Sequence, residues 1–327
     1  MRTLLLSIAT FAIMHVASGQ STHFSQFYAT PMLINPAATG LTTGPYRLAA
    51  AYRSQWNDAG SPYKTITASG DAHIMQDRLA EGNILGLGLV LVNDQTLEGA
   101  VQGNSIAVSS GYHIALDEYQ SIGVGFQGTY NEKRIDFSRL NFENQFNNGE
   151  FNPSIPVGEA LGDGKKYYFD VNAGAMYSFS AEDRSFFAGG SVYNILKKDE
   201  SFLTEQFKKP FLWSLVAGGD IDVGFNQSLY FSGNFRRQGA DNETTIGMAY
   251  GIFLDQTGYT VLKLGLWHRL KDALIPYAGF SINGLQVGFS YDYTMGQTRA
   301  SATNAFEVSL IYLRPDLSEL RRLIPWY

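Results

Sequence analysis

Apolar side chains alternate with polar or small ones along almost the whole of this sequence. In the stretch 46–56 the even positions read Tyr, Leu, Ala, Tyr, Ser and Trp, whereas the odd positions read Arg, Ala, Ala, Arg and Gln. Successive side chains of a β-strand point to opposite faces of its sheet. The pattern therefore predicts strands with one apolar and one hydrated face, and almost no helix.

About fourteen segments carry this alternation, and most have about 9 to 13 residues, enough to cross a bilayer when tilted. The expected strands are 46–56, 63–74, 83–93, 103–115, 119–131, 166–178, 185–196, 211–223, 227–237, 242–254, 259–269, 273–282, 285–293 and 304–313. Lipid offers a strand's backbone no hydrogen-bond partner, so a sheet that spans a membrane must close on itself. We predict an all-β fold, a transmembrane antiparallel up-and-down barrel of about 14 strands that occupies residues 46–313.

The connections between these segments agree with the strand count. Outer-membrane barrels have short periplasmic turns and longer outer loops. If the barrel begins and ends in the periplasm, the connections after odd-numbered strands face outward, and the three longest, 132–165, 197–210 and 294–303, all belong to that set. The opposite connections are mostly tight, and Asn283-Gly284 is typical of a two-residue hairpin turn.

Residues 1–19 have the features of a secretory signal peptide. Arg2 supplies a positive charge, an apolar run follows from Leu4 to Val16, and small residues precede a cleavage expected before Gln20. Only 17% of the 327 residues are charged, against about 25% in soluble domains. The alternative, a secreted soluble β-sandwich or propeller, would need more charge on its hydrated face.

Several functional classes fit the composition poorly. The net charge of −6 argues against nucleic-acid binding, and the absence of cysteine removes thiolate metal sites and thiol catalysis. Residues 123–128 read GVGFQG, but the alternation of Ile122, Val124 and Phe126 through them favours a strand over a dinucleotide-binding loop. The histidines show no metal-ligand spacing, so we expect no enzyme, no cofactor and no metal site.

Charged residues on the hydrated side of the expected strands are candidates for the lumen of the barrel. They are Arg47, Arg53, Asp71, Lys263 and Arg269. Two interpretations remain open: these side chains are simply hydrated or pair across adjacent strands, with Arg47 and Arg53 meeting Asp71, or they hold a plug or cargo. Tyr52 is expected to face lipid and Trp56 to lie at the outer interface, where aromatic girdles occur.

The segments that flank the barrel are candidates for contacts with other chains. Residues 20–45 are irregular but apolar, and are expected either to enter the lumen as a plug or to dock a partner at the periplasmic mouth. The candidate residues of this segment are Phe24, Phe27, Tyr28, Asn35 and Pro36. The tail 314–327 is predicted to be a short periplasmic helix with Asp316 as its N-cap. Its apolar face, which would bind a periplasmic partner or fold under the barrel rim, consists of Leu317, Leu320, Leu323 and Ile324.

An ordered set of motifs resembles the PorP/SprF family of outer-membrane proteins of the type IX secretion system. "FSQFYATPMLINPAATG" (24–40) is similar to the N-terminal signature of that family, and "YRSQW" (52–56) and "SGDAHI" (69–74) to its first two strands. "FDVNAGAMYS" (169–178), "FFAGGSVYNIL" (186–196) and "HRLKDALIPYAGFSINGLQVGFSYDYT" (268–294) follow in the same order. The resemblance extends over nearly the whole chain after the signal peptide, except for the tail.

This resemblance implies an outer-membrane component of the secretion and gliding-motility machinery of Bacteroidetes-type bacteria. Its expected partners are outer-membrane lipid, other type IX secretion subunits, secreted adhesin cargo and a peptidoglycan-linked periplasmic protein. Such a barrel would help to export adhesins or to hold them at the cell surface. The alternative from another functional class is an outer-membrane transport channel for small or hydrophobic solutes.

Overall fold

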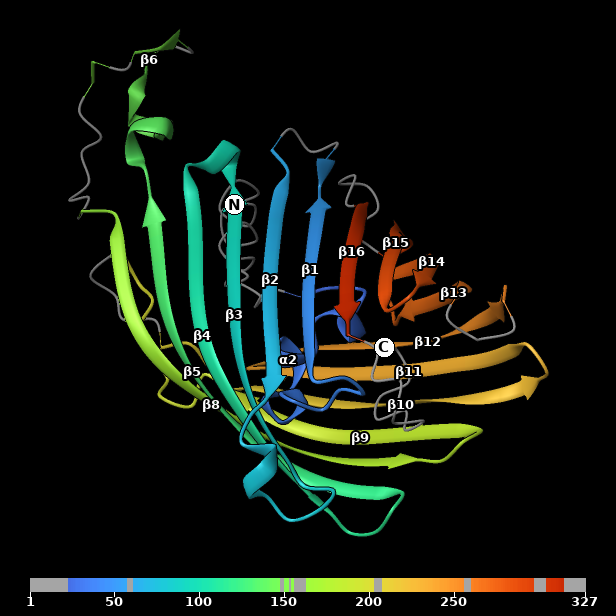
Figure 1. Ribbon diagram of the computed structural model, residues 1–327. Helices are drawn as coiled ribbons and strands as arrows, with labels where there is room; N and C mark the ends of the chain where they lie inside the picture. The colour runs from blue at the N-terminus through green and yellow to red at the C-terminus, as the bar shows by residue number, and fades with distance from the viewer. Residues whose placement is uncertain are drawn as a thin grey trace, which may run out of the picture.

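The computed structural model describes residues 23–57, 61–147, 150–152, 154–155, 163–202, 208–255, 260–296 and 304–314. The expected signal peptide and the tail beyond Arg314, with Asp316, Leu317, Leu320, Leu323 and Ile324, lie outside these residues. The described chain forms a closed antiparallel barrel in which each strand pairs with its sequence neighbours and β1 pairs with β16 (Figure 1).

The barrel strands have the following bounds: β1 Tyr46–Gln55, β2 Tyr63–His73, β3 Ile84–Thr96, β4 Val101–Ala115, β5 Gln120–Ile135, β8 Lys165–Ser180, β9 Arg184–Tyr193, β10 Leu212–Gly224, β11 Gln227–Gln238, β12 Asp241–Phe253, β13 Thr260–Arg269, β14 Ala273–Ile282, β15 Leu285–Thr294 and β16 Ala305–Leu313. A separate two-stranded sheet, β6 Phe146–Asn147 and β7 Glu150–Phe151, lies in the connection between β5 and β8. Each expected segment corresponds to one barrel strand, so the predicted fold of about 14 strands is confirmed. The GVGFQG motif lies within β5, as expected.

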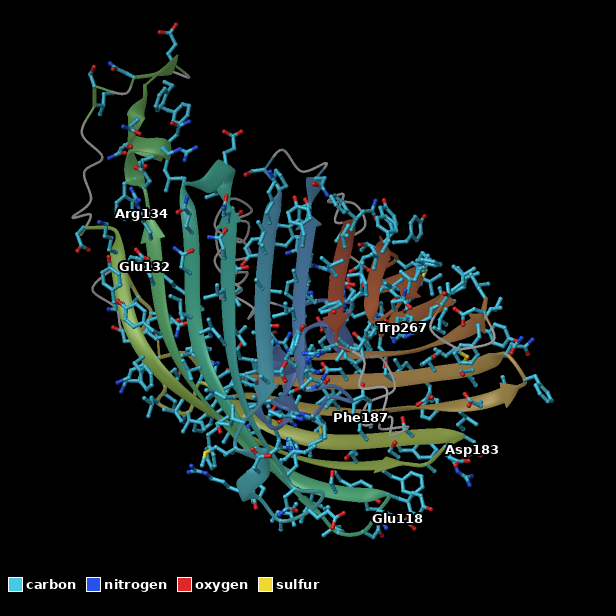
Figure 2. All side chains as sticks on the ribbon, viewed as in Figure 1. Glu118, Glu132, Arg134, Asp183, Phe187 and Trp267 are labelled. Carbon is cyan, nitrogen blue, oxygen red and sulfur yellow. The ribbon has the colours of Figure 1, made fainter. Side chains whose placement is uncertain are left out.

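The main difference from the sequence expectation is the length of β5 and β8. Each has 16 residues, because the two strands continue to pair as far as Lys133↔Lys166 and Arg134↔Lys165. The expected connection 132–165 is therefore partly an extension of this hairpin. Arg134 and Glu132 lie on the projecting part of β5 in Figure 2.

Burial along the strands follows the predicted alternation. In β15 every second residue is buried, from Gln286 to Thr294, and the residues between them are exposed. Leu264 of β13 and Phe126 of β5 are exposed on the outer face. Such an outer surface is stable in hydrocarbon, whereas in water it would leave large apolar side chains uncovered.

The lengths of the connections define two ends of the barrel. The long connections after β5, β9 and β15 share one end with the end of β1, and we call it the outer end because outer-membrane barrels carry their longer loops there. At the other, periplasmic end, Asn283 and Gly284 join β14 to β15 with φ values of 48° and 83°. Two positive φ angles are those of the predicted two-residue turn.

The residues before β1 form three short helical turns inside the barrel rather than an irregular coil (Figure 1). They are η1 Phe27–Ala29, α2 Pro31–Ile34 and η2 Pro36–Ala38, and a proline begins both α2 and η2. Proline suits the first position of a helical turn, where its missing N–H is not needed. Short 3-10 turns in the connections are η4 Gln76–Arg78, η5 Leu97–Gly99, η6 Phe137–Arg139 and η7 Glu143–Gln145. Among the residues described, no helix has the length and apolar character needed to span a membrane.

Candidate functional site

The candidate site is the lumen together with residues 23–45, which we call the N-terminal segment. Almost every side chain from Phe24 to Thr42 is buried. His23 lies near Glu243, at the outer end of β12, whereas Gly44 contacts Arg314 beyond the periplasmic end of β16. The segment therefore runs along the lumen from the outer end to the periplasmic end, where it joins β1.

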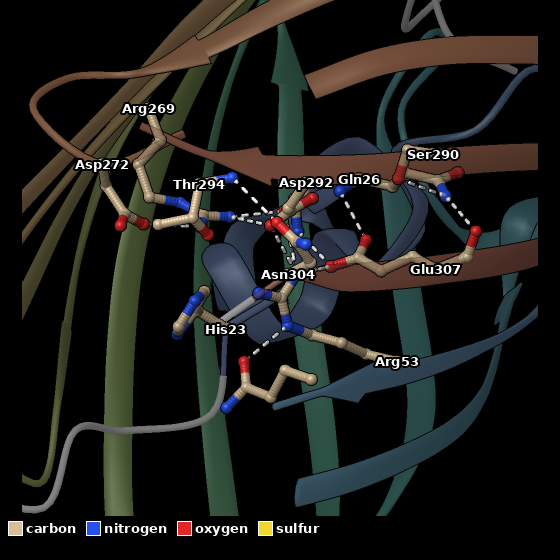
Figure 3. Close-up of polar contacts among 12 residues, drawn as sticks. His23, Gln26, Arg53, Arg269, Asp272, Ser290, Asp292, Thr294, Asn304 and Glu307 are labelled. Atoms are coloured by element: carbon tan, nitrogen blue, oxygen red, sulfur yellow. Dashed lines mark hydrogen bonds and ion pairs between the residues drawn. The ribbon is translucent and has the colours of Figure 1, made fainter. Parts of the chain in front are cut away.

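Two cations and two carboxylates on the wall hold the outer part of the segment (Figure 3). These residues, which we call the outer cluster, are Arg53, Arg269, Asp292 and Glu307. Asp292 Oδ2 lies 3.0 Å from Arg53 and 2.9 Å from Arg269, and Glu307 also pairs with Arg53. All four residues are at most 5% exposed. Buried charges are stable only when they are paired and hydrogen-bonded, and these four are balanced in charge.

Ser25 and Gln26 meet the outer cluster through both backbone and side chain. The backbone N–H groups of Ser25 and Gln26 donate to the two oxygens of Glu307, at 2.6 Å and 2.9 Å. The Ser25 hydroxyl donates to Asp292 at 2.7 Å and accepts from Arg53 and Arg269. The amide of Gln26 is held by Ser290, Ser309 and the backbone carbonyl of Glu307. The dipeptide is thus recognised at five polar groups.

His23 lies next to this contact, near the outer mouth. Burial lowers the pKa of His23 to about 3, although the nearby carboxylate of Glu243 opposes this shift. The imidazole is therefore neutral at pH 7. Its 3.7 Å contact with Glu243 is accordingly not an ion pair at that pH, and Glu243 also lies 3.7 Å from Arg269.

A second charged pair, Arg47 and Asp71, holds the periplasmic part of the segment. Arg47 donates to both carboxylate oxygens of Asp71, from Nε at 2.9 Å and from one terminal nitrogen at 2.8 Å. The same nitrogen donates to the carbonyl of Ala38, and Asp71 accepts from the N–H of Gly40 at 2.7 Å. Nearby, the hydroxyl of Thr39 lies 2.6 Å from that of Ser109.

Between the two charged contacts the lumen has an apolar core, which differs from the hydrated interior that the sequence indicates. Tyr28 packs against Trp267 and Tyr277, with ring centroids 5.3 Å and 5.7 Å away. Phe27 packs edge-on against Tyr28 at 5.6 Å. Trp267 alternates with apolar residues along its strand, so it is expected on the hydrated side. It is 1% exposed because the N-terminal segment covers it.

Glycines on the inward face of the wall admit the backbone of the segment. A β-carbon on Gly125 would overlap the backbone of Pro36 and Ala37, and one on Gly174 would overlap the side chain of Asn35. Asn35 itself donates to the carbonyls of Ala175 and Gly190 at 3.0 Å and 3.3 Å. A close approach of this kind requires a residue without a side chain.

The structure brings together most of the sequence-predicted residues, but not in the pairs that alternation alone suggests. Arg47 meets Asp71, whereas the expected contact of Arg53 with Asp71 is wrong, because β1 and β2 place Arg53 opposite Thr65. Lys263 contacts Gln286 at 3.1 Å and the ring of Tyr230 at 4.5 Å, away from both charged contacts. Phe24, Phe27, Tyr28, Asn35 and Pro36 are all buried in the lumen. Tyr52 is half-buried, and Trp56 is 41% exposed beyond the outer end of β1.

Sequence reasoning missed Asp292 and Glu307 as members of the site. Both lie at inward positions near the outer ends of their strands, which the alternation of β15 and β16 could have shown. Within the described part of the chain no group of three or more His, Cys, Asp or Glu residues could hold a metal ion. The contacts that the site makes with the N-terminal segment are hydrogen bonds from charged and polar groups of the wall.

A closed barrel with an apolar outer skin, alternating strands and long connections at one end is an outer-membrane β-barrel. The family model for the type IX secretion system membrane protein PorP/SprF matches residues 16–312. The chain belongs to this family. Among curated proteins no match was found.

Several solved outer-membrane proteins are similar to the chain. The CymD monoaromatic hydrocarbon channel is 12% identical, with a TM-score of 0.48, 90% of this chain and 93% of that chain covered. A Pseudomonas aeruginosa FadL homologue is 10% identical, with a TM-score of 0.47 and coverage of 85% and 92%. The translocator domain of the autotransporter NalP from Neisseria meningitidis is 12% identical, with a TM-score of 0.38 and coverage of 96% and 99%.

Proposed function

We propose that this barrel serves the type IX secretion machinery by binding an exported adhesin and periplasmic partners, with the N-terminal segment as its plug. Family membership gives the setting. The observation that carries the proposal is the occupied lumen. Residues 24–42 are almost entirely buried and are held by charged contacts at both ends. A lumen filled in this way favours a binding component over an open pore.

Adhesin cargo would meet the barrel at its outer end, where the long connections and the outer cluster lie. Periplasmic subunits, including a peptidoglycan-linked protein, would meet the turns at the opposite end and the tail face of Leu317, Leu320, Leu323 and Ile324. The tail beyond Arg314 lies outside the described residues, so this part of the proposal depends on the sequence pattern alone. The rival function remains a transport channel for small or hydrophobic solutes.

Affinity purification from the native membrane separates the two functions. The tagged chain should co-purify with secretion subunits and an adhesin, and a deletion strain should lose adhesin from its surface. A similarly tagged, unrelated outer-membrane barrel is the control for non-specific recovery. Normal secretion combined with impaired uptake of a small hydrophobic compound would instead favour the transport channel.

The plug has its own test in planar bilayers. The intact chain should conduct poorly, and deletion of residues 24–40 should open a stable conductance, because the lumen would then lack the side chains that fill it. The Arg184→Gln variant, altered only at an exposed pair with Asp183 at the periplasmic rim, is the matched control. Equal conductance of the deletion variant and the intact chain would rule out the plug.

A further inference from the structure

The outer cluster has the properties of a peptide-binding site. One carboxylate, that of Glu307, accepts from two consecutive backbone N–H groups, which is a way to bind a peptide irrespective of its side chains. Asp292 and the two arginines then surround a hydroxyl, and Ser290 and Ser309 bind both ends of an amide side chain. The absent side chain of Gly288 leaves room for that amide, since a β-carbon there would lie 2.6 Å from Gln26 Oε1.

The site lies toward the outer mouth rather than in the middle of the lumen. Arg269 connects Asp292, whose side chain is 2% exposed, to Asp272, whose side chain is 42% exposed, at 2.9 Å and 3.0 Å (Figure 3). The aromatic contacts of Tyr28 with Trp267 and Tyr277 lie next to the place of the Gln26 amide, since a β-carbon on Gly288 would approach both Gln26 and Tyr277. Because exposed Asp272 is linked through Arg269 to Asp292, a peptide arriving from outside would meet this side of the outer cluster first.

We propose that Arg53, Arg269, Asp292 and Glu307 form a peptide-binding site that the chain's own Ser25–Gln26 occupies when the barrel is plugged. Its other ligand is a peptide segment of the exported protein, with a small hydroxyl residue followed by an amide residue. This inference rests on the proposed function, because the exported protein supplies the competing peptide. The site is neutral overall, so it selects hydrogen-bonding groups rather than net charge.

Competition with the chain's own segment sets the design of the test. A tethered ligand acts at a millimolar effective concentration, so an added peptide competes poorly with the intact chain. The Gln26→Ala variant lacks the amide that Ser290 and Ser309 hold, and its own segment binds the wall less tightly. The probe is a fluorescent synthetic peptide with the sequence of residues 23–30, HFSQFYAT, added to the full Gln26→Ala chain in detergent.

The expected result is saturable binding of HFSQFYAT to the Gln26→Ala chain. A peptide with alanine at both the serine and the glutamine positions should bind about tenfold to a hundredfold more weakly, because it loses the hydroxyl's hydrogen bonds to charged groups and the amide's hydrogen bonds to Ser290 and Ser309. Adding Glu307→Gln should weaken binding of HFSQFYAT to a similar degree. Adding Lys263→Gln, a buried change away from the cluster, should leave it within about twofold.

Heat-dependent gel mobility shows whether the Gln26→Ala chain is folded. If the folded variant bound the two peptides equally, or bound HFSQFYAT without saturation, the proposal would be overturned. The outer cluster would then serve only to anchor the plug. These outcomes are independent of adhesin secretion. A chain that bound the peptide but had no role in secretion would contradict the proposed function and not the peptide site.

Discussion

Replacing Asp71 with alanine should destabilise this barrel far more than the loss of one hydrogen bond would. Asp71 accepts two hydrogen bonds from Arg47, at 2.9 Å and 2.8 Å, and one from the N–H of Gly40 at 2.7 Å. Arg47 is 1% exposed. The Asp71→Ala chain would therefore retain a buried guanidinium without its carboxylate and a buried N–H group without its acceptor.

The expected cost follows from these contacts. Removing one partner of a buried ion pair lowers the free energy of unfolding by about 3–5 kcal/mol, because the remaining charge is left uncompensated. The matched control is Asp183→Ala, which breaks a 3.4 Å pair with Arg184 whose side chains are 61% and 54% exposed. An exposed pair of that kind contributes about 0–1 kcal/mol. The double variant Arg47→Met/Asp71→Leu should recover much of the loss, since no charge then remains buried.

Reversible urea unfolding in lipid vesicles, followed by tryptophan fluorescence, measures these differences. Protease sensitivity of residues 38–44 reports separately whether the periplasmic part of the segment detaches. A loss below about 1 kcal/mol in the Asp71→Ala variant, equal to that of the exposed control, would refute the reasoning. So would a double variant no more stable than Asp71→Ala.

Three further predictions concern the segment and the outer face. The pKa of His23 is about 3 in the folded barrel, against an ordinary value of 6.5. The bound, neutral imidazole is therefore fully stable above pH 6.5, and this stability is lost as the pH falls. Release of the outer part of the N-terminal segment, measured by protease cleavage, should become easier by about 2 kcal/mol between pH 7 and pH 5. A cleavage rate that does not depend on pH, or a pH dependence that persists in His23→Gln, would contradict this. Gly125→Val should displace the N-terminal segment, because its β-carbon would meet the backbone of Pro36. Gly128→Val should not, because its β-carbon would meet only a phenylalanine side chain. Equal protease resistance of the segment in the two variants would contradict this prediction. Leu264→Lys, on the outer face, should lower the free energy of unfolding in vesicles by about 2–4 kcal/mol if the residue lies near the bilayer centre. An unchanged free energy of unfolding would show that Leu264 does not face the hydrocarbon.

The barrel itself could be predicted from the sequence because each strand meets two different environments, and a period of two records which side chains face each. The pairing of Arg47 with Asp71 was accessible for the same reason: both are inward residues of one hairpin, whose register places them opposite each other. Tight turns such as Asn283-Gly284 fixed the order of the strands.

The contacts that hold the segment could not be predicted in this way. Arg53 lies opposite Glu307 only because β1 pairs with β16, and that register depends on how the barrel closes. The segment has no period, and its path depends on where the wall lacks side chains, as at Gly125 and Gly174. Inward glycines in the middle of strands were the available signal, since glycine inside a strand often marks the close approach of another backbone.

The N-terminal segment lies inside the barrel, and a disulfide tests this placement directly. The chain has no cysteine, so the double variant Thr39→Cys/Ser109→Cys can form only one intramolecular bridge. Because the native hydroxyls are 2.6 Å apart, the two thiols should lie close enough to form a disulfide under mild oxidation in the native membrane. The control Thr39→Cys/Ser290→Cys, with Ser290 at the outer cluster, should not. Two unbridged, reagent-accessible thiols at positions 39 and 109 in folded protein would contradict the account.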